Sequence, residues 1–203
     1  MSTRTLHLCF DPVGDELLST DGFALLMGML LDQQMMLEFA FLGPARLAQR
    51  MGTVDHLDIA AIASYDAEEF ATLMATPPAV HRYPGTMAGR VQALAQHVIQ
   101  EYDGDPNALW SDVRSGAALL ARLQALPGYG EQKARILVAL LGKQCSVTPR
   151  GWRASAGDYG LKGSTRSAAD VTDRESLLAV RTTKQELKRA AAARANANVN
   201  IRS

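Results

Sequence analysis

The chain has 203 residues, of which 47% are hydrophobic, and its 21 basic residues balance 21 acidic ones. This composition is typical of a globular protein and excludes wholesale disorder. Two cysteines, Cys9 and Cys145, are too few for a disulfide framework, a four-cysteine zinc site or an iron–sulfur cluster, so we expect reduced thiols, no metal and no other cofactor.

The charges are unevenly distributed along the chain. Residues 1–142 contain 9 Lys and Arg against 16 Asp and Glu, whereas residues 143–203 contain 12 against 5. The basic excess of the last third favours a polyanionic partner. A basic tail that only improves solubility is the alternative.

Nothing in the sequence predicts a membrane protein. Residues 1–9 lack the long apolar core of a signal peptide. The most apolar stretch, residues 23–41, is interrupted by Asp32, Gln33, Gln34 and Glu38, so its apolar part is too short to cross a bilayer. We therefore expect a cytoplasmic monomer.

Helical periodicity dominates the chain and strand patterns are scarce, which predicts an all-α fold. The expected helices, in chain order, cover residues 22–41, 45–51, 54–64, 67–74, 85–102, 116–125, 131–141 and 175–193. Asp66 and Asp173 precede two of these helices and are expected to be their N-caps, and Ser19, Thr20 and Asp21 are the candidates for the N-cap of the helix that begins at residue 22.

Breaks between the helices are also expected. Gly43-Pro44 is expected to interrupt the chain, and residues 103–106 to form a loop. Residues 146–169 are rich in Gly, Ser, Thr and Arg and are expected to be mostly loop. The last residues, 196–203, are expected to fray.

The most informative segment is Leu-Pro-Gly-Tyr-Gly at residues 126–130, between two apolar helices. Pro127 ends the preceding helix, and Gly128 and Gly130 permit backbone angles that other residues avoid. The hairpin leads into a helix N-terminus, where unpaired N–H groups and the helix dipole favour an anion. We therefore expect residues 126–143 to bind a DNA phosphate. A plain turn between two helices is the alternative.

The pattern Leu-Pro-Gly-x-Gly-x-x-x-Ala at residues 126–134 resembles the helix–hairpin–helix (HhH-GPD) superfamily of base-excision DNA glycosylases, which includes endonuclease III. More narrowly, the chain resembles a small actinobacterial subgroup without the iron–sulfur motif. The resemblance covers residues 17–148 and includes Leu-Leu-Asp-Gln-Gln at residues 30–34 and the segment 83–105. It implies two helical lobes with a lesion pocket between them, into which a damaged base is swung out of the duplex.

The resemblance also implies which residues contact DNA. Residues 1–150 would form the helical core, and residues 151–203 would complete the second lobe with a loop and a basic helix. Gln34, with Gln33 beside it, would fill the gap left in the duplex. The expected DNA-binding residues are Gln33, Gln34, Pro127, Gly128, Tyr129, Gly130, Gln132, Lys133, Arg150 and Trp152.

Two further features of the last third concern DNA. Trp152 and Tyr159 are candidates for stacking on a base, although packing of their loop is the preferred interpretation. The final helix is a candidate for contacts with the DNA backbone through Arg181, Lys184, Lys188 and Arg189.

Two departures from the family pattern concern catalysis. Family members that cleave the strand have a lysine two residues after the second hairpin glycine, where this chain has Gln132. Lys133 is adjacent, but one step along a helix turns a side chain by about 100°. We therefore expect Lys133 to point away from the pocket and no Schiff base to form. The family aspartate that stabilises the cationic sugar corresponds to Thr148, which has no negative charge.

Three carboxylates are candidates to replace that aspartate. Asp32 is the first choice because it lies beside the glutamines, where burial would shift its pKa; a helix cap or an arginine partner is the alternative reading of it. Asp158 would reach the cleft if the Gly-rich loop folded over it, and Glu38 lies one helical turn beyond Gln34.

These residues predict a nucleoid-associated, monofunctional DNA glycosylase that acts on double-stranded DNA with a damaged base. The alternative is a protein of the same fold that binds lesions without catalysis.

Overall fold

The computed structural model describes residues 5–200, with side chains up to residue 193. Within this range the chain forms ten α-helices and three short 3-10 helices and no strand. A single isolated bridge pairs Ser115 with Arg150. The all-α fold class is therefore confirmed.

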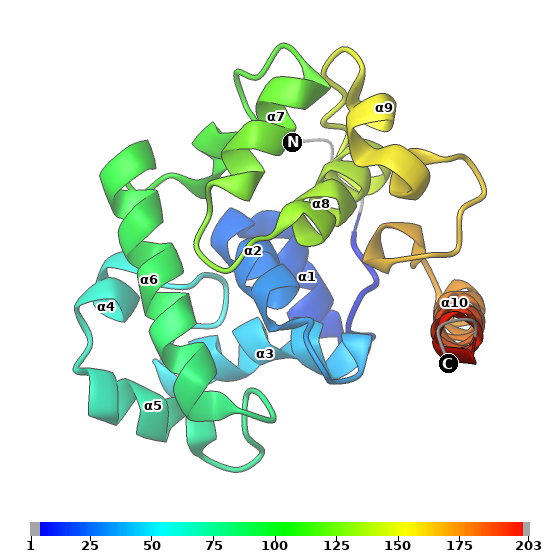
Figure 1. The fold of residues 1–203 in the computed structure, drawn as a ribbon. Coiled ribbons are helices and arrows are strands. Elements are labelled where there is room, and N and C mark those ends of the chain that lie inside the picture. Colours follow the sequence, from blue (N-terminus) through cyan, green and yellow to red (C-terminus); the bar gives the residue numbers. More distant parts are fainter. Residues whose placement is uncertain (1–4, 201–203) are drawn as a thin grey trace.

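The helices follow one another in this order: α1 (Pro12–Thr20), α2 (Gly22–Leu31), α3 (Leu37–Arg50), α4 (Ile59–Ser64), α5 (Ala67–Ala75), α6 (Pro84–Tyr102), η1 (Pro106–Leu109), α7 (Gly116–Gln124), α8 (Glu131–Gln144), α9 (Trp152–Ala156), η2 (Gly157–Gly160), η3 (Ala168–Asp170) and α10 (Arg174–Asn200). Figure 1 shows α1 and α2 at the centre, α3–α6 on one side and α7–α9 on the other. Every residue of α2 is buried. This helix is therefore the centre of a continuous apolar core to which all parts of the described chain contribute.

Several helices begin where the sequence predicts because a side chain caps them. Asp21 Oδ1 accepts hydrogen bonds from Phe23 N and Ala24 N, at 2.7 and 3.1 Å, at the start of α2. Asp66 caps α5 in the same way. Asp173 Oδ1 accepts from Ser176 N at 2.7 Å before α10. The expected N-caps Asp66 and Asp173 are confirmed, and among the candidates Ser19, Thr20 and Asp21 the N-cap of α2 is Asp21.

The predicted helices of the first third are wrong in several places: α1 was not predicted, and the helix expected over residues 54–64 begins only at Ile59. The helix expected over residues 22–41 is two helices, α2 and α3, separated by residues 32–36. Helix α3 then continues through Gly43-Pro44, where a break was expected. A Cβ at Gly43 would lie 2.5 Å from Leu31 Cδ1. Glycine at this position therefore lets α3 pack closely on the end of α2.

The end of the chain contains more helix than expected. Residues 146–169 include α9 and η2, and both pack against α8. Helix α10 is described as far as Asn200, and residues 201–203 lie outside the described range. Within residues 5–200, no helix combines the length and the apolar character that crossing a bilayer requires.

Candidate nucleic-acid interface at the glycine hairpin

The hairpin between α7 and α8 lies against the C-terminal end of α2. Gly128 has a φ of +79°, and a Cβ there would lie 2.5 Å from Leu30 Cδ1, so both its conformation and its packing require glycine. Gly130 has an ordinary φ of −83°, and a Cβ there would meet nothing within 4 Å. The expectation that glycine is needed for an unusual backbone angle is confirmed for Gly128 and wrong for Gly130.

The N-terminus of α8 has no side-chain cap, because its N-cap residue is Gly130. Helices α3, α6 and α9 also lack a side-chain cap, whereas α1, α2, α4, α5 and α7 begin with an aspartate or serine that accepts a hydrogen bond from a first-turn amide. The amides at the start of α8 are left for an external acceptor, and the exposed hairpin glycine leaves space for one to approach. The helix dipole favours an anion there.

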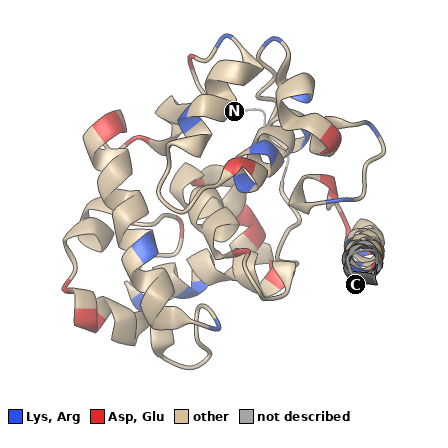
Figure 2. Cartoon of the chain, in the orientation of Figure 1, with Lys and Arg blue, Asp and Glu red and all other residues tan. Residues whose placement is uncertain are grey.

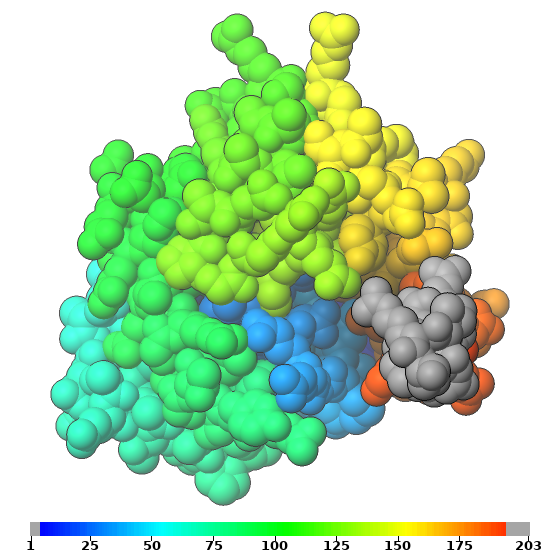
Figure 3. Space-filling view, in the orientation of Figure 1, coloured from blue at the N-terminus to red at the C-terminus, as the bar shows by residue number. Residues whose placement is uncertain are grey.

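A pocket of about 510 Å³ opens beside the hairpin. This volume lies within the range of small-molecule sites, about 300–1,000 Å³. The lining residues are Met29, Asp32, Gln33, Gln34, Met35, Gln132, Lys133, Ile136, Tyr159, Arg166, Lys184 and Leu187. Figure 3 shows the blue atoms of the segment between α2 and α3 lying between the yellow-green atoms of α8 and the orange atoms of α10. The pocket therefore brings together segments that are far apart in the sequence.

Two of the predicted pocket residues, Asp32 and Gln34, belong to the loop between α2 and α3. Asp32 is half-buried and is the single carboxylate among the lining residues. Asp32 is the C-cap residue of α2, with its backbone N donating to Gly28 O at 3.1 Å, so the alternative reading as a helix cap fits its position. Its side chain makes no hydrogen bond or ion pair with another described residue, so the arginine partner is not present within residues 5–193. Gln34 is exposed at the mouth and has a φ of +54°, a conformation that non-glycine residues rarely adopt.

Gln33 is fixed by three neighbours. Its Nε2 donates to Leu30 O at 2.9 Å, and its Oε1 accepts from Arg90 Nη1 of α6 at 3.0 Å. Its backbone carbonyl lies 3.0 Å from Nε2 of His81, which is buried. The other ring nitrogen of His81, Nδ1, accepts from Tyr83 N at 2.9 Å, which assigns the proton to Nε2. These bonds hold the loop in one conformation before any ligand arrives.

Lys133 turns into the pocket, so the expected direction of this side chain is wrong. Its Nζ donates to Met29 O and, at 3.1 Å, to Leu30 O, two carbonyls at the end of α2. The long, flexible lysine stem reaches these acceptors although its Cα is one position away from the family lysine. Burial lowers the pKa of Lys133 from 10.5 to about 8, with Asp32 acting in the opposite direction. Gln132 lines the same pocket and donates to Tyr159 Oη at 2.9 Å.

The Gly-rich loop folds back towards the pocket, and Tyr159 lines it. Asp158 does not line the pocket, but its Oδ2 accepts from Arg166 Nη1 at 3.0 Å, and Arg166 does line the pocket. Glu38 lines a different pocket and pairs with Arg181 of α10. Two of the three candidate carboxylates are therefore held in ion pairs, and Asp32 is left facing the pocket.

Two aromatic residues of the predicted DNA-binding set are buried. Tyr129 is 5% exposed, and its hydroxyl donates to Leu26 O at 2.6 Å, which ties the hairpin to α2. Burial raises the pKa of Tyr129 well above its ordinary value. Trp152 is 8% exposed and packs so closely on Gly142 that a Cβ there would lie 2.5 Å from the indole. Trp152 is therefore a packing residue and cannot stack on a base in this conformation.

Three further positions also lie outside the pocket lining. Pro127 is half-buried in the hairpin. Arg150 is exposed beside its bridge to Ser115. Thr148, which corresponds to the family aspartate, lines a separate pocket with Trp110.

Basic side chains surround the candidate pocket. Lys133, Arg166 and Lys184 are part of its lining, and Arg90 is bonded to Gln33 at its edge. Figure 2 shows basic residues on α8, on the loop after α9 and on α10. Because Asp32 is the single acidic residue in the described lining, the local charge favours an anion although the chain as a whole is neutral.

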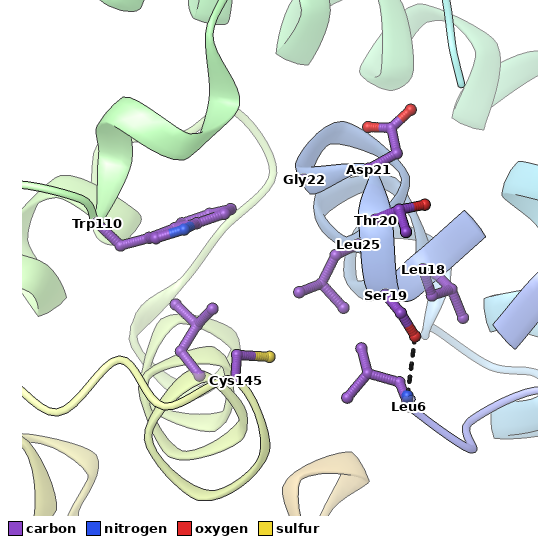
Figure 4. Close-up of a pocket in the computed structure, with 10 residues that line it drawn as sticks. Leu6, Leu18, Ser19, Thr20, Asp21, Gly22, Leu25, Trp110 and Cys145 are labelled. Carbon is purple, nitrogen blue, oxygen red and sulfur yellow. Dashed lines mark hydrogen bonds between the residues drawn. The ribbon is translucent and has the colours of Figure 1, made fainter. Parts of the chain in front are cut away.

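A second cavity, between α1, the start of α2 and Trp110, is much smaller (Figure 4). Its volume is about 30 Å³ and its walls include Leu6, Leu25 and Cys145. It has room for a water molecule rather than a substrate. Among the residues that the structure describes, no three His, Cys, Asp or Glu side chains gather as a metal site.

Comparison with models of protein families, with curated proteins and with solved structures finds no match for this chain. Its functional assignment therefore depends on the geometry of the hairpin and the pocket.

Proposed function

We propose that the protein is a monofunctional DNA glycosylase of the HhH-GPD type, which binds duplex DNA at the hairpin and hydrolyses the bond between a damaged base and its sugar in the pocket. The observation that supports this most is the position of an uncapped helix N-terminus directly beside a pocket with one unpaired carboxylate. The first feature suits a phosphate and the second suits a sugar that becomes cationic.

The hairpin supplies contacts that do not depend on the DNA sequence. Backbone amides at the start of α8 would donate to one phosphate, and the open space at Gly130 lets that phosphate approach. Basic residues around the pocket would neutralise neighbouring phosphates. Together these contacts would place one nucleotide at the mouth of the pocket.

The pocket supplies a place for the extruded base. Met29, Met35 and Ile136 offer apolar surface for its faces, and Asp32 offers a negative charge for the sugar. Gln34, exposed at the mouth, would occupy the space that the base leaves in the duplex. Asp32 thus takes the place of the family aspartate, because the corresponding Thr148 has no charge and lines another pocket.

Water, not an amine, is the proposed nucleophile. Position 132, which matches the family lysine, holds a glutamine, and the amine of Lys133 is bonded to two backbone carbonyls. We therefore expect base release without strand cleavage.

The test is incubation of the purified protein with duplexes that contain uracil, hypoxanthine, oxidised guanine, alkylated adenine or a mismatch. Base release on at least one duplex is expected, seen as strand breaks only after hot alkali, and borohydride should trap no covalent complex. A borohydride-trapped complex that Lys133→Ala abolishes would contradict the monofunctional mechanism.

A second candidate function is lesion binding without catalysis, which the uncharged Thr148 at the family aspartate position favours. Tight binding to one of these duplexes with no base release from any of them would support this candidate over the glycosylase.

A further inference from the structure

We infer that Lys133 is a positioning residue that couples phosphate binding at the hairpin to the loop of residues 32–34, which faces the extruded nucleotide. This inference rests on the proposed function. It concerns the coupling between the hairpin and the loop of residues 32–34, and it assigns no catalytic residue.

Lys133 touches both parts of the site. Its backbone amide belongs to the first turn of α8, which begins at Glu131 after the N-cap residue Gly130 and has no side-chain cap. Its side chain reaches across to α2 and donates to Met29 O and Leu30 O. One residue therefore joins the proposed phosphate site to the end of the helix from which the Asp32 loop departs.

The end of α2 needs an external donor. A helix leaves its last carbonyls without partners from its own backbone. At this end, Gly28 O accepts from Asp32 N at 3.1 Å and Leu31 O accepts from Gln33 N at 2.6 Å. Lys133 donates to the remaining two carbonyls, those of Met29 and Leu30, and Leu30 O also accepts from Gln33 Nε2 at 2.9 Å. The lysine therefore completes the helix end and fixes the direction in which the loop leaves it.

Charged groups from each neighbouring element act on this amine. Asp32 from the loop after α2 favours its charged form, and Arg90 from α6 disfavours it. Arg166 and Lys184 share the same pocket, and Glu131 and Arg135 lie on α8 itself and pair with each other. A phosphate at the start of α8 adds a negative charge to this set. It would favour the ammonium form, whose hydrogen bonds to carbonyls are stronger than those of a neutral amine.

The test compares two duplexes of the same sequence, one undamaged and one with a tetrahydrofuran analogue of an abasic site. The analogue presents the gap that Gln34 would fill and requires no knowledge of the base. Fluorescence anisotropy gives the affinity of each duplex at pH 7 and at pH 9. The proteins are the wild type, Lys133→Met, Lys133→Arg and the control Lys162→Met, which removes an exposed lysine outside the pocket lining.

We expect Lys133→Met to bind both duplexes more weakly, because a basic side chain of the pocket is lost, and in addition to lose about 5- to 10-fold of the preference for the abasic duplex, a typical coupling between two sites. The wild type should lose the same preference between pH 7 and pH 9, as the amine loses its proton. Lys133→Arg should keep the preference at both pH values, and Lys162→Met should behave as the wild type.

Four results would overturn the inference. An unchanged preference in Lys133→Met, or a wild-type preference that is the same at pH 7 and pH 9, would show that the lysine does not couple the two parts. Equal losses on both duplexes in Lys133→Met, with an altered circular dichroism spectrum, would show a role in folding alone. Failure of the wild type to bind either duplex would remove the proposed function as well, which distinguishes the two failures.

Discussion

The two ends of α2 are built in different ways. At its start, the side chain of Asp21 accepts hydrogen bonds from amides of the first turn, so the cap and the residues that it binds are neighbours in the sequence. At its other end, the carbonyls of Met29 and Leu30 accept from Lys133, about a hundred residues further along, and Leu30 O also accepts from Gln33 Nε2. The candidate site lies at the second end. Where a helix end is completed from a distant segment, that segment also sets the direction of the loop that follows.

Substitution of a hairpin glycine, which packs against the C-terminal end of α2, is expected to have the largest effect on the free energy of unfolding. Gly128→Ala should lower the free energy of unfolding by about 2–4 kcal/mol, because it combines a left-handed backbone conformation with a clash against Leu30. Gly130→Ala should cost no more than about 1 kcal/mol, since its φ is ordinary and its Cβ has space. Urea unfolding measures both.

Gly130→Ala also tests the phosphate site, because its methyl group occupies the space through which an anion would approach. We expect weaker binding to every duplex alike, whatever its sequence. A folded Gly130→Ala protein with wild-type affinity would contradict phosphate binding at the hairpin.

The free energy of unfolding should depend on pH because of Lys133, which binds the C-terminal end of α2. Burial holds the pKa of Lys133 near 8 in the folded chain, below the ordinary 10.5. Between these pH values the unfolded chain binds the extra proton, so the free energy of unfolding should rise with pH, by at most about 3 kcal/mol. Lys133→Met lacks the titrating group and should not show this rise. Parallel curves for the two proteins, from urea unfolding at pH 7 to 10.5, would contradict a buried amine.

The locally built end of α2 should respond more simply. Asp21→Ala removes the cap and the bond from Leu57 N to Asp21 Oδ2, which is 2.7 Å long. We expect a loss of about 1–2 kcal/mol in the free energy of unfolding. Affinity for duplex DNA, measured on the same preparation, should stay within error. A marked loss of affinity would mean that the two ends of α2 are not separable.

The smallest expected effect concerns α10, whose Lys184 lines the pocket while Lys188 lies one turn further along. Replacement of both by alanine should reduce the slope of log affinity against log salt by up to about 2, with stability nearly unchanged. Arg114→Ala removes an exposed charge outside the pocket lining and serves as the control. Equal slopes in all three proteins would exclude α10 from the interface.

The difference between the two ends of α2 also explains what the sequence can predict. The caps Asp21, Asp66 and Asp173 act on residues beside them, and all three could be predicted. Helix α1 was missed although Asp11-Pro12 forms a local cap and first-turn pattern that could have revealed it. Lys133 reaches the end of α2 through a contact that spans about a hundred residues, which no local pattern indicates.

The candidate site could be predicted in part for the same reason. Asp32, Gln33, Gln34 and Gln132 were expected near one another, and all line one pocket. Tyr129 and Trp152 look like exposed contact residues from the hairpin and loop composition, but their burial depends on the packing of α2 and α8. The direction of Lys133 was mispredicted because helical rotation alone ignores the reach of a lysine towards free carbonyls.

The central claim is that Asp32 is the charge that assists base release. The most direct measurement is single-turnover release of the base from whichever duplex the wild type attacks, for Asp32→Asn, Asp158→Asn and Glu38→Gln. We expect Asp32→Asn to bind the duplex normally and to release the base about 100- to 1,000-fold more slowly, as loss of a transition-state charge contact predicts. The other two variants should retain their rates, because those carboxylates are paired with arginines. Normal release by Asp32→Asn would contradict the account.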